Sequence, residues 1–549
     1  MKQTKPQKSH TEQRVRSDQP QPQNDILSSE AALRVISSKI SREMRFAFLA
    51  AVVAGLIAHL YFFTNNIPNS DQITNSPYHT QHSWDLALGR WAINYADKLG
   101  TCFTLPWVTG LLCLFFIGLV SALLINLFQV KSRLNIILIS AMIAVAPTIS
   151  ISFSYSFMAD IYMISYFFAV LAVFCADRYK TIGIISGAIL IACSMGLYQA
   201  YIGVTITLCI ILLIVKLLMQ EQDLRTLFFY GLRLLLTGIL GVVLYFMILW
   251  AHLSYHHISL ADYRGVNNMG QVKISELPSL FIQCYQYFFD VFFTNYIFNN
   301  TPFQITTYSV LFAIILGLII YQAVRKKINR GAAAVLGILV LLLPFAVGVM
   351  KLLAPETDVS PLMAPQIPLF LILPLLLLEL PNVAGKQSFK QVMSWLAAVS
   401  CFILVFGYWE LDNIMYLSLQ LQYERTYSIS LRILDRIEQL PGYNHNLKLA
   451  VIGDLPSENY PQTGSSEDAV LKGYPQTDKE ILPYRTISSS WNKFMRDYLG
   501  ADIADIGWET NDAEIKKIKD SSDFKNMKEF PSADSTKIMN GVIVVKLSS

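Results

Sequence analysis

The stretch that decides the fold runs from residue 65 to residue 105 and contains Asn69-Ser70-Asp71-Gln72 and Trp84-Asp85-Leu86-Ala87-Leu88-Gly89-Arg90-Trp91. It is polar and aromatic, and it separates two long apolar runs at residues 46–63 and 106–130. Crossing the hydrocarbon core of a bilayer takes about 20 apolar residues, so each run is close to that length. Connectors this long are uncommon and frequently functional. The stretch predicts a membrane protein with a functional loop after its first span.

Within the loop, Trp84, Leu88, Trp91 and Tyr95 recur at helical spacing and predict an amphipathic helix. Trp and Tyr suit the headgroup level of a bilayer, so we expect this helix to lie at the membrane surface and to present charged groups to a lipid-linked substrate. The alternative is a packing loop whose charges are incidental.

The composition supports a polytopic membrane protein. Of the 549 residues, 53% are hydrophobic and only 15% are charged, whereas soluble domains have about 25% charged residues. No CxxC pair or His/Cys pattern predicts a zinc site. Glycine-rich phosphate loops and the GxSxG elbow are also absent in a suitable context, so nothing in the sequence predicts nucleotide binding.

The apolar runs predict a mainly α-helical fold with about eleven transmembrane helices. The predicted spans are residues 46–63, 106–130, 134–152, 161–176, 181–196, 201–218, 229–252, 305–324, 332–353, 363–380 and 394–410. Basic clusters at 39–45, 131–133, 178–180, 325–330 and 386–390 all fall on one side of this alternation. By the positive-inside rule that side is the cytoplasm, which puts the N-terminus inside and the C-terminus outside.

Three regions follow from this reading. Residues 1–45 are predicted to be a mostly disordered cytoplasmic segment whose later part forms a short surface helix. Residues 46–410 form the transmembrane domain, with long outer loops at 64–105 and 253–301, the second holding an aromatic stretch at 280–293 that rests on the membrane. Residues 411–549 begin with a long helix and form a small extracytoplasmic α/β domain, with strands near 448–454 and 541–546 and a helix near 490–500.

Ionisable residues near apolar spans are costly and tend to mark function. At the outer ends of the predicted spans we expect Asp71, Asp85 and Asp160 as catalytic candidates. The substrate-binding candidates are Arg90, Trp91, Tyr198, Gln199, Arg264, Lys351 and Glu356.

Each of these residues also has a structural explanation. Asp85 and Asp160 could be favourable charges in the first turns of their helices. Arg90 could reach out to headgroup phosphates. Tyr198 and Gln199 could form hydrogen bonds between helices. Opposite charges lie together at one predicted membrane face, which favours a functional role for these candidate residues as a group.

An outward-facing transferase meets no cytoplasmic nucleotide sugar, so its donor must arrive on a lipid. A polyprenyl-phosphate sugar carries its own leaving group. The protein then supplies a carboxylate base for the acceptor hydroxyl and cations for the phosphate. We assign the cations to Arg90 and Lys351 and place the base first at Asp71, with Asp85 as the alternative.

Four motifs carry a resemblance to a known family: Asn69-Ser70-Asp71, Gly89-Arg90-Trp91, Tyr198-Gln199-Ala200 and Val451-Ile452-Gly453-Asp454. Over about residues 50–460 the chain resembles the bacterial glucosyltransferase II-type membrane family. The resemblance implies a GT-C class architecture with a carboxylate base in the first outer loop and a second acid near a later outward turn. Asp71 and Asp160 are the matching positions.

The resemblance implies a transferase that moves a hexose, in this family glucose, from undecaprenyl phosphate to a cell-surface glycan such as O-antigen. Its partners are the lipid-linked donor, the glycan acceptor, the bilayer, a donor synthase and a flippase, with no nucleic acid. No cofactor is predicted with certainty, and a divalent cation stays open. Two alternatives remain: a flippase or other transporter of lipid-linked saccharides, and a polymerase or ligase of surface polysaccharide.

Overall fold

The structure is a computed structural model. It describes residues 29–75, 82–99, 103–219, 223–263, 265–357, 359–381, 387–455, 488–506 and 511–548. The chain divides into two compact units, Met1–Arg42 and Glu43–Ser549, and each is described by itself. The described part of the first unit is helix α1 (Ser29–Lys39), the short helix expected near the end of the N-terminal segment. The Arg34 guanidinium forms an ion pair with Glu30 at 2.7 Å one turn away.

Helices make up most of the rest of the chain. The first half contains α2 (Arg42–Thr64), α3 (Ser70–Asn75), α4 (His82–Ala87), α5 (Ile93–Leu99), α6 (Pro106–Leu127), α7 (Arg133–Val145), α8 (Pro147–Phe153), α9 (Ala159–Arg178), α10 (Thr181–Leu197), η1 (Gln199–Tyr201), α11 (Ile202–Met219) and α12 (Leu224–His256). The second half contains η2 (Val266–Asn268), η3 (Ile274–Glu276), α13 (Leu277–Phe292), α14 (Pro302–Arg325), α15 (Arg330–Val347), α16 (Met350–Leu353), η4 (Pro361–Met363), α17 (Ile367–Leu378) and α18 (Gln387–Glu438).

Local sequence signals set several helix starts. Asp223 and Asn329 accept hydrogen bonds from backbone N–H groups in the first turns of α12 and α15, as N-cap residues do. Thr301 and Gln304 form a reciprocal capping box at the start of α14. Pro106 occupies the first turn of α6, where its missing N–H costs nothing.

The structure has fewer candidate spans than the eleven predicted. Among the described residues, eight helices are long and apolar enough to cross a membrane, and nine if α7 and α8, bent by 46° at Pro147, count as one span. The other two predicted spans are the shorter helices α10 and α17, of 17 and 12 residues. At about 1.5 Å per residue, α17 is only some 18 Å long, well short of the roughly 30 Å hydrocarbon core. Length therefore separates these two helices from the others, although both are apolar.

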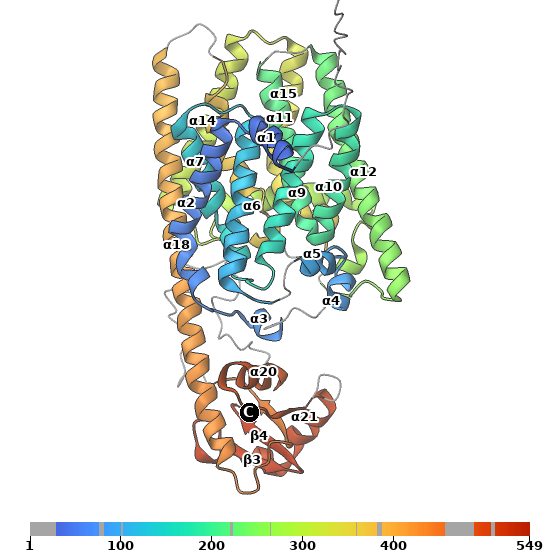
Figure 1. The fold of residues 1–549 in the computed structure, drawn as a ribbon, viewed down its shortest axis with the longest axis vertical. Coiled ribbons are helices and arrows are strands. Elements are labelled where there is room, and N and C mark those ends of the chain that lie inside the picture. The colour runs from blue at the N-terminus through green and yellow to red at the C-terminus, as the bar shows by residue number, and fades with distance from the viewer. Residues whose placement is uncertain are drawn as a thin grey trace, which may run out of the picture. The chain divides into compact units, whose positions relative to one another are not determined.

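The long helices run alongside one another in Figure 1, where α18 (orange) is the longest. Helix α9 packs against both α6 and α10, and α10 in turn packs against α12. One continuous apolar core connects residues from α2 through α18. Residues 411–438, predicted to follow the last span as a separate helix, are the second half of α18.

Basic residues at several helix ends form polar contacts with neighbouring helices. Lys131, after α6, forms an ion pair with Glu43 at the start of α2. Lys216 of α11 forms an ion pair with Asp177 of α9 at 2.9 Å. The Lys326 ammonium, after α14, donates to the Met219 carbonyl at the end of α11. These contacts join the end of α6 to the start of α2, and the end of α11 to the ends of α9 and α14.

The C-terminal region is a small α/β fold. Its sheet has the order β2 (Ala504–Asp505), β1 (Lys448–Ile452), β4 (Val542–Lys546) and β3 (Thr536–Met539). Strand β1 pairs in parallel with β2 and β4, and β3 pairs antiparallel with β4. Helices α20 (Ser488–Leu499), α21 (Asn511–Asp520) and α22 (Ser522–Lys525) complete the region. The strands predicted near 448–454 and 541–546 and the helix near 490–500 are confirmed.

Candidate active site

The predicted amphipathic helix through Trp84 and Tyr95 is wrong, because the chain breaks at Gly89 into α4 and α5. Gly89 has φ +80°, the left-handed conformation that ends many helices. Its N–H bonds to the Leu86 carbonyl at 2.9 Å, and the Arg90 N–H bonds to the Asp85 carbonyl at 2.8 Å. These two hydrogen bonds form a Schellman motif, which closes α4 and places Arg90 directly after the turn.

Two side chains from distant helices hold this turn. The Gln199 Nε2 donates to the Leu88 carbonyl at 2.7 Å, and the Tyr245 hydroxyl donates to the Gly89 carbonyl at 2.9 Å. Gln199 Nε2 also lies 3.1 Å from the Tyr245 hydroxyl. Gln199 was predicted to bind substrate, but its visible role is to fix the backbone that carries Arg90.

Trp91 is half-buried and packs against side chains of neighbouring helices. A methyl group added at Gly196 of α10 would lie only 2.5 Å from the Trp91 ring, so the two are in direct contact. The other side of the indole stacks on His252, with ring centres 5.7 Å apart. The His252 Nε2 in turn lies 2.9 Å from the Tyr95 hydroxyl. Trp91 therefore joins the loop to α10 and α12.

Arg90 is a largely buried cation. Its guanidinium lies 4.8 Å from the centre of the Tyr198 ring, a distance at which a cation and an aromatic face attract each other. Burial alone lowers the pKa of Arg90, but Tyr162, Tyr198 and Asp85 raise it by more, so the group stays charged. Its Nε is buried and has no hydrogen-bond partner among the described residues. A buried donor of a charged group without a partner is expensive, which points to an anionic ligand.

The two catalytic candidates of the first loop occupy different environments. Asp85, in the first turn of α4, is buried with 5% of its surface exposed. Asp71, in the first turn of the short helix α3, is exposed. Both carboxylates and Arg90 act electrostatically on the hydroxyl of Tyr162, near the start of α9. Asp71, Asp85 and Arg90 therefore all lie within electrostatic range of Tyr162.

Of the remaining candidates, Asp160 and Lys351 each form a hydrogen bond close to them in the sequence. Asp160 begins α9, where its carboxylate accepts from the Ile161 N–H at 3.0 Å, as a first-turn acid does. The Lys351 ammonium donates to the Thr357 carbonyl at 2.9 Å and so closes its own loop. Arg264 lies outside the described residues.

Glu356 lines a large polar cavity of about 530 Å³. The Asn268 amide nitrogen lies 3.3 Å from both of its carboxylate oxygens, and a methyl added at Gly265 would touch its Cβ. The same loop carries Tyr263, which packs edge-on against Trp84 and acts electrostatically on Arg90. The cavity is lined by Asn268, Gln271, Lys273, Glu276, Ser279, Leu280, Gln283, Pro355 and Glu356.

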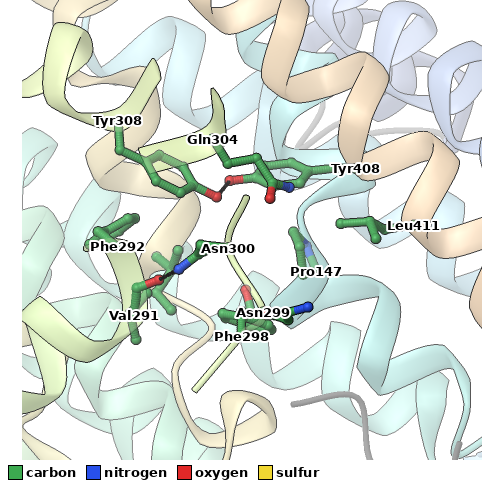
Figure 2. Close-up of a pocket in the computed structure, with 12 residues that line it drawn as sticks. Pro147, Val291, Phe292, Phe298, Asn299, Asn300, Gln304, Tyr308, Tyr408 and Leu411 are labelled. Carbon is green, nitrogen blue, oxygen red and sulfur yellow. Dashed lines mark hydrogen bonds between the residues drawn. The ribbon is translucent and has the colours of Figure 1, made fainter. Parts of the chain in front are cut away.

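A second pocket, shown in Figure 2, is too small for a sugar. It lies between α8, α13, α14, α17 and α18, and its volume of about 20 Å³ has room for about one water molecule. The hydroxyls of Tyr308 and Tyr408 meet across it at 2.7 Å, and Asn300 bonds to the Val291 carbonyl. Its side chains already bond to one another, so we assign it no substrate.

Sequence reasoning missed Tyr162 and Tyr245. Both lie within apolar runs, where a tyrosine reads as a packing residue. A usable signal existed for Tyr162, which comes two residues after the candidate Asp160. Among the described residues, no group of three or more His, Cys, Asp or Glu side chains could hold a metal ion.

The fold and the site define a multi-pass membrane protein with a charged and aromatic cluster beside a polar cavity. The chain belongs to the glucosyl transferase GtrII family, whose model matches residues 60–378, more than half of its length. It is therefore a glucosyltransferase, and the predicted family is confirmed. Three of the four motifs lie within the match, whereas Val451-Ile452-Gly453-Asp454 lies beyond its end. The matched segment contains every candidate site residue and ends before α18. No curated protein and no solved structure matches the chain.

Proposed function

We propose that the protein transfers glucose from a polyprenyl-phosphate donor to a cell-surface glycan, with inversion, at the outer face of the cytoplasmic membrane. The observation that carries this proposal is the buried Arg90 guanidinium, whose Nε has no partner among the described residues. A phosphate on a lipid fits such a group, because its oxygens accept charge-assisted hydrogen bonds from a guanidinium. We give the phosphate role to Arg90 rather than Lys351, whose ammonium holds its own loop.

The acceptor hydroxyl must lose a proton as it attacks the anomeric carbon. We assign this proton to Asp71, because its carboxylate is exposed to an incoming acceptor, whereas Asp85 is buried. Asp85 then balances the charge of Arg90, and Asp160 orients the acceptor. The proposed base and the proposed phosphate-binding cation both act electrostatically on Tyr162, which supports placing them in one site.

We place the acceptor glycan in the polar cavity of Glu356. Its volume of about 530 Å³ falls within the roughly 300–1,000 Å³ usual for ligand sites. Amides of Asn268, Gln271 and Gln283 supply both donors and acceptors, which suits the hydroxyl groups of a sugar. The Tyr263 loop connects this cavity to Arg90.

We also propose a GT-C class architecture with the N-terminus inside and the C-terminus outside. The basic helix ends would face the cytoplasm. An odd number of crossings, nine or eleven, leaves the two ends of the chain on opposite sides. A donor synthase and a flippase would supply the lipid-linked sugar at the outer face.

The experiment is transfer by the purified protein in lipid nanodiscs. The donor is synthetic undecaprenyl-phosphate glucose, and the acceptor is surface polysaccharide extracted from cells that lack the protein. Mass spectrometry should detect one added hexose per modified unit, and NMR of the product should show an anomeric configuration opposite to that of the donor. The proposal would be overturned if no glucose were transferred from this lipid donor to the polysaccharide and glucose were transferred only from another class of donor.

A further inference from the structure

Helix α3, which carries Asp71, shares a hydrophobic core with the C-terminal region. Ile73 has only 1% of its surface exposed and belongs to the same buried cluster as Ile429 and Ile433 of α18. The cluster also includes Trp491, Phe494 and Met495 of α20 and residues of strands β1 and β4. Helix α20 packs against α3. A residue of the first loop is thus a core residue of the C-terminal α/β fold.

Asn69, just before α3, and Gln72 within it are fixed to the helix bundle. The Asn69 amide donates to the Ser154 carbonyl at 2.7 Å, and its oxygen accepts from the Gln72 N–H at 2.7 Å. The Gln72 side chain accepts a hydrogen bond from the Ser156 hydroxyl. Helices shorter than about 12 residues are marginal in water without tertiary contacts. A six-residue helix such as α3 therefore depends on both sets of neighbours.

The C-terminal fold is joined to the bundle by an unbroken helix. Within the bundle, α18 is held by Asp412, which accepts from the Ser150 hydroxyl, and by Tyr416, whose hydroxyl lies 2.8 Å from the His59 Nδ1. The same helix continues to Ile429 and Ile433 without interruption. Because α18 is anchored in the bundle, it can hold the core around Ile73 in a fixed position.

From these contacts we infer that the C-terminal α/β fold positions the active site by clamping α3 through Ile73. This inference rests on the proposed function, in which Asp71 takes the proton of the acceptor. Asp71 lies two residues before Ile73, so the packing of Ile73 sets the direction and depth of the carboxylate. Ile73 is a positioning residue, since it touches the hydrophobic core and no reacting group. The clamp comes from a part of the chain outside the family match, which ends at residue 378.

The test compares Ile73→Ala with Ile73→Leu in the full-length protein in nanodiscs. The matched control is Ile518→Ala, which removes similar atoms from the separate core cluster that includes Phe524 and Val544. We expect Ile73→Ala to lower kcat by about 10²-fold, as misplaced catalytic groups do, with the KM for undecaprenyl-phosphate glucose unchanged. Ile73→Leu should recover most of the activity. Ile518→Ala should lower the melting temperature at least as much as Ile73→Ala does and keep kcat near that of the unmodified protein.

Hydrogen–deuterium exchange of residues 69–75 gives a second readout. Exchange there should quicken in Ile73→Ala and stay slow in Ile518→Ala. Unmodified kcat in Ile73→Ala, or an equal loss of kcat in Ile518→Ala, would overturn the clamp. If the unmodified protein transfers no glucose from the lipid donor, the proposed function fails instead, and the exchange of residues 69–75 still decides whether α3 depends on Ile73.

Discussion

The Gln199 Nε2 donates a hydrogen bond to the Leu88 carbonyl oxygen at 2.7 Å. This contact ties η1, at the end of α10, to the turn from which Arg90 projects. Tyr198, the residue before Gln199, provides the ring beneath the Arg90 guanidinium. One short segment therefore fixes both the backbone and the side chain of the proposed phosphate ligand.

Gly89→Ala should damage transfer more than its size suggests. The left-handed conformation costs an L-residue about 1–2 kcal/mol, and the added methyl would lie 2.6 Å from the Gln199 Nε2 and 2.8 Å from the Tyr245 hydroxyl. We expect transfer to fall by about tenfold or more, the equivalent of 1.4 kcal/mol. Gly238→Ala is the control, because a methyl there meets nothing within 4 Å. Equal activity of the two variants would show that the turn does not position Arg90.

Replacing Arg90 tests the phosphate ligand. Arg90→Ala should raise the KM for undecaprenyl-phosphate glucose and lower kcat/KM by about 10–100-fold, since a charge-assisted hydrogen bond contributes roughly 1.5–3 kcal/mol. Arg90→Lys should recover only part of this loss, because an ammonium cannot form the planar two-point contact. Lys537→Ala, in β3, serves as the control for expression and folding. Full donor use by Arg90→Ala would assign the guanidinium a purely structural role.

The base is tested by three isosteric variants, Asp71→Asn, Asp85→Asn and Asp160→Asn. Loss of a general base costs about 10²–10⁴-fold in rate, and we expect this loss in kcat for Asp71→Asn. Asp160→Asn should keep a larger share of kcat and raise the KM for the acceptor. Full turnover by Asp71→Asn with an inactive Asp85→Asn would move the base to Asp85. Activity in all three variants would rule out a carboxylate base at these positions.

The polar cavity is tested through the acceptor. Glu356→Gln and Asn268→Ala should raise the KM for extracted surface polysaccharide by about fivefold or more, because each removes a hydrogen bond of roughly 1 kcal/mol. The KM for the lipid donor should stay unchanged. Gln439→Ala, at an exposed position after α18, is the matched amide control. An unchanged acceptor KM in both variants would place the glycan elsewhere.

The orientation is tested with a reporter fused after Ser549. Alkaline phosphatase at this position should be active, since it folds only outside the cytoplasm, and green fluorescent protein should stay dark. A fusion truncated after Lys327, between α14 and α15, should give the opposite pair of signals. Cytoplasmic activity of the Ser549 fusion would reverse the proposed location of the active site.

The sequence by itself determined the class of fold, because the apolar runs and alternating strands are local properties of the chain. It identified a multi-pass helical protein, located the strands that became β1 and β4, and marked the loop that carries Asp71, Asp85 and Arg90. Segment length limited the prediction of the membrane spans. Residues 181–197 and 367–378 are as apolar as the longer helices, yet their own helices are shorter than the other candidate spans.

Only the tertiary structure decided how the site is assembled, since packing brings together residues that no spacing rule connects. Tyr245 reaches the Gly89 carbonyl from α12, and Tyr162 of α9 lies within electrostatic range of Asp71, Asp85 and Arg90. Ile73 reads as one apolar residue in a polar loop, but it lies in a core built by α18 and α20. Burial of an apolar side chain depends on what surrounds it in three dimensions, so its partner could not be read from residues 65–105 alone.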